Sequence, residues 1–381
     1  GTVTTATRAG ASFGFALLWA ILFSIIATII LQEMTARLGI ISRKGLGDAV
    51  REQFVNPILK YGSMWLVIIA ISIGCAAYMA GDLLGTSLGI STLTGISPNI
   101  LGPIVGVILL ILGLSGSYKL IEKLMIVLIV TMCLTFITTM FMTKPDLGEL
   151  FQGAFMPNIP AGSIIMIIAL IGTTVVPYNL FLHASNVQER WNKPSDLRDS
   201  RWDTIISISV GGLITAAIII TAGATIKGLE IKSAADLSLQ LEPILGEWAL
   251  VFMSIGLFAA GFSSALAAPL GAAMTVSSVL KWGNNMKDKR FKIVFVIIIS
   301  IGIIGSALNL NPLSVLLFAQ ALNGILLPVI AIMLLIIMNN KKFLGNYTNT
   351  LRANIFGGIV ALICTGLGIY SLVDAIQSFL S

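Results

Sequence analysis

The residues best suited to chemistry lie where a long apolar run is interrupted, at Gly172-Thr-Thr-Val-Val-Pro-Tyr-Asn179. Both flanks, 164–171 and 180–187, have the composition of membrane helix. Pro177 has no backbone N–H, so it cannot complete the hydrogen bond to the residue four positions back. A break inside a membrane is tolerated only where protein or a water-filled cavity satisfies the freed carbonyls. Secondary transporters hold solutes with such carbonyls, so we expect a small ion or polar solute to bind here.

The composition is that of a protein that crosses the membrane several times. The chain is 56% hydrophobic and 10% charged, and its mean hydropathy is +0.97, whereas a soluble domain carries about 25% charged residues. The net charge of +6 does not indicate nucleic-acid binding, because the positive residues gather in particular loops. Three isolated cysteines inside apolar runs and a single histidine argue against disulfides and against a histidine metal cluster. No nucleophile–base pair, phosphate loop or metal triad appears, so we do not expect an enzyme.

Ten apolar stretches are long enough to span or nearly span a bilayer. We place them near 15–38, 62–89, 100–116, 120–142, 162–190, 202–226, 246–281, 293–309, 312–338 and 353–373. Alternate loops between them hold most of the Lys and Arg residues, while the opposite loops hold only Lys144, Lys227 and Lys232. Because basic loops stay in the cytoplasm, we expect a multi-pass protein of the cell (inner) membrane with its basic loops cytoplasmic.

A second Gly/Thr-rich patch opens the chain, at Gly1-Thr-Val-Thr-Thr5. We interpret residues 1–9 as the outer half of a helix whose inner half precedes residue 1, which would give eleven spans. Two five-helix units then follow, about 1–142 and 162–338, with an extra helix about 353–373, all within one transporter domain over 1–381. Since five is odd, the second unit enters from the opposite side, and the fold is an all-α inverted repeat.

Several motifs resemble the Nramp (SLC11) divalent-metal transporters along nearly the whole chain. They are Thr7-Arg-Ala-Gly-Ala-Ser-Phe-Gly-Phe15, Leu31-Gln32, Ala36-Arg-Leu-Gly-Ile40, Pro177 with Asn179-Leu-Phe-Leu-His183, Val187-Gln-Glu-Arg190, Gly261-Phe-Ser-Ser264, and Gln320 with Leu327-Pro328. The resemblance implies the LeuT-type fold and transport of a divalent metal cation.

The departures from the family pattern are specific. The family motif Asp-Pro-Gly-Asn corresponds here to Gly1 and Thr2, with Thr2 in the Asn position. The family's Met-Pro-His is Val176-Pro177-Tyr178, which removes the thioether that favours soft metals. In the third helix the family carries two carboxylates three residues apart; here Asp82 keeps one of them and Met79 stands at the other position. In the tenth helix the family carries two glutamines; here Gln320 keeps one and Leu326 replaces the other.

The side chains that remain near the break offer mainly hydroxyl and amide oxygens, and neutral oxygen ligands suit a hard cation or a polar solute. The expected substrate-binding residues are Gly1, Thr2, Thr173, Thr174, Val176, Pro177, Tyr178, Asn179, Gln320 and Asn323, with Thr2, Thr173 and Gln320 as the metal ligands. For coupling and gating we expect Asp82, an intramembrane carboxylate; His183; Ser263 and Ser264, by analogy with a sodium site; and the i,i+4 pair Glu33–Arg37. Each also has a structural interpretation, as a packing or helix-pairing residue.

The sequence therefore favours a secondary transporter of divalent cations, shifted toward hard ions such as Mg²⁺. A Na⁺-coupled transporter of a polar organic or anionic solute, or a non-transporting membrane sensor on the same fold, stays open. We expect no cofactor beyond a transported or coupling cation, whether divalent metal, H⁺ or Na⁺. The expected partners are membrane lipid and a small ion or small polar solute, with no nucleic acid; the oligomeric state is undetermined.

Overall fold

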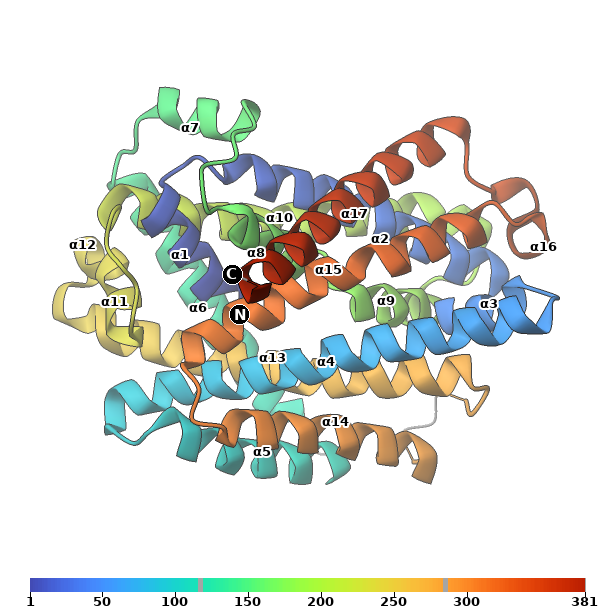
Figure 1. The fold of residues 1–381 in the computed structure, drawn as a ribbon, viewed down its shortest axis with the longest axis horizontal. Helices are drawn as coiled ribbons and strands as arrows, with labels where there is room; N and C mark the ends of the chain where they lie inside the picture. Colours follow the sequence, from blue (N-terminus) through green and yellow to red (C-terminus); the bar gives the residue numbers. More distant parts are fainter. Residues whose placement is uncertain (116–118, 284–286, 381) are drawn as a thin grey trace.

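The computed structural model describes residues 1–115, 119–283 and 287–380, and within these ranges all regular secondary structure is helical. Nine long helices form the body of the bundle (Figure 1): α2 (Leu18–Ser42), α4 (Pro57–Thr94), α5 (Pro98–Ser115), α6 (Lys119–Met142), α10 (Leu197–Thr225), α13 (Ala249–Val279), α14 (Lys289–Ala307), α15 (Pro312–Met338) and α17 (Leu351–Leu380). Three shorter helices cross its interior: α1 (Thr2–Phe13), α8 (Ile164–Thr174) and α9 (Pro177–Arg190).

Short helices lie at the two ends of the bundle. At one end are α7 (Leu147–Phe155), α11 (Ala234–Ser238) and α12 (Glu242–Leu245), and at the opposite end are α3 (Leu46–Gln53) and α16 (Lys341–Leu344) (Figure 1). Four 3₁₀ turns complete the described part of the chain: η1 (Pro194–Asp196), η2 (Leu239–Leu241), η3 (Gly246–Trp248) and η4 (Gly345–Tyr347). The connections that carry many basic residues, around α3 and α16, therefore lie at the end away from the connections that carry few.

The predicted spans are found as helices, with shifted ends. In the part of the chain that the structure describes, nine helical segments are long and apolar enough to cross a membrane, and the apolar part of α6, Ile126–Met142, is shorter. The stretch predicted near 62–89 starts earlier, because the Asn56 side chain accepts hydrogen bonds from the backbone of Ile58 and Leu59 at the helix start. With 38 residues, α4 is about 57 Å long at 1.5 Å per residue, so it projects beyond the hydrocarbon core.

The first span begins three residues later than predicted, at Leu18. The chain turns between α1 and α2 through Gly14, whose φ of 57° is a conformation that glycine adopts without strain. The stretch predicted near 246–281 becomes α13, preceded by a turn at Gly246 with φ 49°.

Small residues let the central helices approach closely. A Cβ atom added at Gly172 of α8 would lie 2.0 Å from the Gln320 carbonyl oxygen of α15, and one added at Gly324 of α15 would lie 2.5 Å from the Ile168 carbonyl oxygen of α8. The two backbones are thus in direct contact over more than one turn, as is typical of small residues at membrane helix interfaces. This contact fixes α8 against α15 beside the break.

Candidate functional site

The break predicted near Pro177 is present. Helix α8 ends at Thr174, and Val175 (ψ 77°) and Val176 (φ −82°, ψ 118°) leave the helical conformation before α9 begins at Pro177. The proline occupies the first helical position, where its missing N–H costs no hydrogen bond. The prediction of a helix interrupted between 172 and 179 is therefore confirmed.

A cavity of about 230 Å³ lies beside this break. It is enclosed by residues of α1, α4, α8, α9, α13 and α15 and of the connection between α8 and α9. The lining residues are Gly1, Thr2, Val3, Thr4, Tyr78, Asp82, Gly85, Thr173, Val176, Tyr178, Asn179, Leu257, Ala260, Gly261, Ser264 and Gln320. Seven of the ten residues expected to bind substrate line it, together with Asp82 and Ser264 from the coupling set.

Two threonine hydroxyls join α1 to α8 at the cavity wall. Thr2 Oγ1 lies 2.8 Å from Thr173 Oγ1, a distance at which either hydroxyl donates to the other. The two Gly/Thr-rich patches, 171 residues apart in the chain, therefore meet in space. Both residues belong to the expected metal-ligand set, and Gln320, the third member, lines the same cavity.

The cavity contains one carboxylate among its lining residues, that of Asp82. Asp82 is 1% exposed, so it does not sit at a solvated helix end. Its Oδ2 accepts a 2.6 Å hydrogen bond from Ser264 Oγ of α13. Gly261, one turn before Ser264, leaves room for α4, since a Cβ there would lie 2.5 Å from Thr86 Oγ1. This close packing brings the serine within reach of the carboxylate.

The sequence analysis missed Tyr78, which lies in the same cavity. Its hydroxyl donates a 2.8 Å hydrogen bond to the carbonyl of Gly172 and also contacts the side-chain oxygen of Gln320. Its ring packs edge-on against Tyr178, with centroids 6.2 Å apart. One signal was readable: Tyr78 precedes Asp82 by four residues, so the two share a helix face. The partner oxygens lie 94 and 242 residues further along the chain, and no local pattern indicates them.

Three expected substrate-binding residues do not line the cavity. The Thr174 hydroxyl bonds back to the Leu170 carbonyl of its own helix at 2.9 Å. Pro177 serves as the first residue of α9. Asn323 is buried, and its side-chain oxygen lies against Gly74 of α4, where a Cβ would come within 2.6 Å. These residues shape the surrounding helices.

Besides the pair Glu33–Arg37, two expected coupling residues, Ser263 and His183, lie outside the cavity lining. Ser263 is adjacent to Ser264 but does not line it. His183 lies in α9, and its Nε2 atom is buried with no hydrogen-bond partner in the described structure. The coupling role expected for these two residues stays a prediction.

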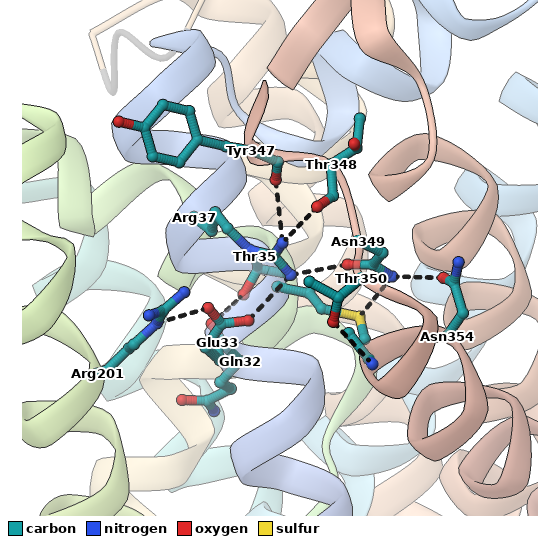
Figure 2. A network of polar contacts seen from close by, with 12 residues as sticks. Gln32, Glu33, Thr35, Arg37, Arg201, Tyr347, Thr348, Asn349, Thr350 and Asn354 are labelled. Carbon is teal, nitrogen blue, oxygen red and sulfur yellow. Dashed lines mark hydrogen bonds and ion pairs between the residues drawn. The ribbon is translucent and has the colours of Figure 1, made fainter. Parts of the chain in front are cut away.

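The pair Glu33–Arg37 belongs to a larger polar network (Figure 2). Arg37 Nη2 lies 3.1 Å from Glu33 Oε2, and Arg201 Nε of α10 lies 2.9 Å from Glu33 Oε1. Arg37 also donates to the carbonyls of Tyr347 (3.0 Å) and Thr348 (3.3 Å) and to Asn349 Oδ1 (2.7 Å), all in the segment that leads into α17. The network thus ties α2, α10 and the start of α17 together, and one carboxylate serves two guanidinium groups.

The lining favours cations. Hydroxyl, carbonyl, amide and carboxylate oxygens face the cavity, and among its described lining residues there is no Met, Cys or His. In the described ranges no group of three or more His, Cys, Asp or Glu side chains is placed to hold a metal. Oxygen ligands of this kind are preferred by hard cations, whereas a soft metal would favour sulfur.

Comparison with known proteins agrees with this architecture. The sequence model of Nramp, described as natural resistance-associated macrophage protein-like, matches residues 1–374. The chain belongs to the Nramp family. Similar proteins include those named divalent metal cation transporter MntH in Yersinia pestis (strain Pestoides F) and in Yersinia pseudotuberculosis serotype O:1b (strain IP 31758). Each is 24% identical over 386 residues, covering 98% of this chain and 91% of the relative.

Solved structures show the same fold. The crystal structure of the Eremococcus coleocola manganese transporter, in complex with an aromatic bis-isothiourea substituted compound, has a TM-score of 0.78 at 20% identity, covering 100% of this chain and 84% of that one. MhsT in complex with L-phenylalanine has a TM-score of 0.60 at 12% identity, covering 98% and 97%. The prediction of an all-α, LeuT-type membrane protein related to Nramp is therefore confirmed.

Proposed function

We propose that this Nramp family member is a secondary transporter of divalent cations and that the cavity beside the break is its substrate site. The proposal rests on one observation above all: a cavity whose polar lining is made of hydroxyl, amide and carboxylate groups, with Asp82 as its charged side chain, lies where two Gly/Thr-rich segments meet. The names of the MntH relatives and of the Eremococcus coleocola manganese transporter support a divalent cation as the substrate.

Hard ions such as Mg²⁺ fit this lining better than soft ones. Val176 stands where the family carries a methionine, so the described lining offers no thioether. Mg²⁺ keeps several of its waters when it binds protein carboxylates, and the cavity of about 230 Å³ is several times the ~30 Å³ that a water molecule occupies in the liquid. A partly hydrated Mg²⁺ beside Asp82 is accordingly the proposed bound species.

The transport cycle is proposed to be alternating access between two inverted repeats, about 1–142 and 162–338, in the cell (inner) membrane. The connections around α3 and α16 would face the cytoplasm, because they carry many of the basic residues. In this orientation the Glu33–Arg37–Arg201 network lies at the cytoplasmic end.

Uptake into proteoliposomes tests the proposal. Purified protein is reconstituted, and influx of Mg²⁺, Mn²⁺ and Cd²⁺ is followed with an enclosed indicator dye, with protein-free liposomes as the control. We expect saturable Mg²⁺ influx that Mn²⁺ inhibits and that exceeds Cd²⁺ influx at equal concentration. Absence of influx and of competition by all three ions would refute a divalent-cation transporter.

The size of the cavity also favours a second candidate, a Na⁺-coupled carrier of a small polar solute. A lining of hydroxyl and amide groups can orient such a solute, and the hydrogen-bonded Ser264 and Asp82 offer oxygens to Na⁺. In the same liposomes, an inward Na⁺ gradient would then drive uptake of labelled amino acids or other small polar solutes. Influx of a solute that requires Na⁺, without divalent-cation influx, would decide for this candidate.

A further inference from the structure

Tyr78 holds two oxygen acceptors that belong to the proposed cation site. The first is the Gly172 carbonyl, 2.8 Å from the Tyr78 hydroxyl at the end of the broken helix. The second is the Gln320 side-chain oxygen of α15, in direct hydrogen-bond contact with the same hydroxyl. Both Tyr78 and Gln320 line the cavity, and Tyr78 is only 4% exposed.

The Tyr78 hydroxyl cannot fully satisfy both of these oxygen acceptors. A tyrosine hydroxyl carries a single proton, yet two oxygens converge on it from two different helices. The proton satisfies one acceptor fully and the other only in part. A backbone carbonyl and an amide oxygen are ordinary ligands of hard cations, whereas a neutral phenol is not among them. The Gly172 and Gln320 oxygens are therefore suited to bind a cation, but in this structure the Tyr78 hydroxyl takes the place that the cation would occupy.

The position of Asp82 strengthens this interpretation. It lies one turn after Tyr78 on α4 and lines the same cavity. Ser264 supplies one hydrogen bond to one of its oxygens, while an ionised carboxylate has about four acceptor positions. An ion bound by Asp82 could also bind the Gly172 and Gln320 oxygens, but only after their hydrogen bonds to the Tyr78 hydroxyl are broken.

We infer that Tyr78 sets the cation affinity of this cavity by competing with the substrate for the Gly172 and Gln320 oxygens. This inference rests on the proposed transport of divalent cations. Tyr78 is then a specificity-determining residue: it weakens binding and so allows release, and it disfavours ions that cannot displace its hydroxyl.

The decisive variant is Tyr78→Phe, which keeps the ring and its edge-on contact with Tyr178 but removes the donor. We expect the KM for Mg²⁺ influx in proteoliposomes to fall by about fivefold, the affinity equivalent of one hydrogen bond of about 1 kcal/mol that no longer has to be broken. The matched control is Ser87→Ala, which removes a buried hydroxyl of α4 that donates only to the Leu83 carbonyl of its own helix. Its KM should equal that of the wild type.

A second variant tests whether KM falls because the Gly172 and Gln320 oxygens lose their hydrogen bonds to Tyr78, or only because removal of a hydroxyl enlarges the cavity. Tyr178→Phe removes another hydroxyl from the same cavity, and no hydrogen bond of that hydroxyl is found in the described structure. Equal decreases in KM for Tyr178→Phe and Tyr78→Phe would overturn the inference. The double variant Tyr78→Phe/Gln320→Leu should lose part of the gain, since one of the two released oxygens is then missing.

The remaining outcomes are also decisive. A folded Tyr78→Phe protein whose KM is unchanged or higher, with active wild type beside it, overturns the inference and leaves the proposed function standing. A Tyr78→Phe protein that does not fold also overturns it, because the hydroxyl would then be a structural requirement. Wild-type protein that moves no divalent cation refutes the proposed function itself, and the inference with it.

Discussion

Ser264 Oγ donates a 2.6 Å hydrogen bond to Asp82 Oδ2, and this bond joins α13 to α4 across the cavity. Both residues were expected to act in coupling, on separate grounds: one as an intramembrane carboxylate, the other by analogy with a sodium site. The bond makes them one unit. The serine orients the carboxylate and leaves most of its acceptor positions free for an ion.

The first prediction concerns the charge of Asp82. Asp82→Asn removes the carboxylate from the cavity and keeps its size, so a divalent cation loses the opposite charge that offsets its dehydration. We expect kcat/KM for Mg²⁺ influx to fall by at least tenfold, equivalent to about 1.4 kcal/mol. Ser264→Ala keeps the charge and removes one hydrogen bond, so its effect should be smaller, about fivefold. If both variants kept the wild-type kcat/KM, the ion would not bind at Asp82.

A second prediction concerns metal preference. Val176→Met restores a thioether at the non-helical residue before Pro177, on the cavity wall. Because a thioether is a soft ligand, the ratio of Cd²⁺ to Mg²⁺ affinity should rise by about tenfold, measured as competition in the uptake assay. Val176→Leu, of similar size and without sulfur, is the control. An equal shift in both variants would mean that size, and not sulfur, changes the selectivity.

A third prediction tests the contact between α8 and α15. Gly172→Ala places a Cβ atom 2.0 Å from the Gln320 carbonyl oxygen, so one helix must move. We expect the free energy of unfolding to fall by about 1–3 kcal/mol, the usual cost of overpacking, seen as a lower Tm in detergent, together with reduced influx. Gly211→Ala in α10 is the control, since a Cβ there meets nothing within 4 Å. An unchanged Tm for Gly172→Ala would contradict this packing.

A fourth prediction concerns the carboxylate that Arg37 and Arg201 share. Glu33→Gln leaves both guanidinium groups without their countercharge, and the Arg37 side chain is only 6% exposed. We expect a loss of about 2 kcal/mol in the free energy of unfolding, typical of a hydrogen bond to a charged group. Asp203→Asn is the matched control, because its pair with Arg190 is exposed (39% and 69%) and such pairs contribute about 0–1 kcal/mol. Equal effects of the two variants would show that the network adds nothing beyond an exposed ion pair.

Much of the architecture was readable from the sequence. Apolar stretches, a proline inside one of them and the uneven distribution of basic residues predict the helices and the break, because each depends on local composition. The meeting of Thr2 and Thr173 was also predictable, from the parity of the repeat and the resemblance to Nramp.

The details of the site depend on the phase and packing of helices, which local patterns do not fix. Thr173 and Thr174 are neighbours, yet one faces the cavity and the other its own helix, since successive helical residues point about 100° apart. The burial of Asp82 and the contacts of Tyr78 depend on where α8, α13 and α15 lie against α4. Likewise, the hydrogen bond from Arg37 to Asn349 joins residues that are 312 positions apart in the chain.

Close glycine contacts hold the two halves of the broken helix against different helices. Helix α8 is pressed against α15 at Gly172 and Gly324, whereas α9 is pressed against α2, where a Cβ at Gly39 would lie 2.3 Å from the Ala184 carbonyl oxygen. Only Val175 and Val176 connect the two halves. A change in the angle between α8 and α9 would therefore be taken up at these two non-helical residues.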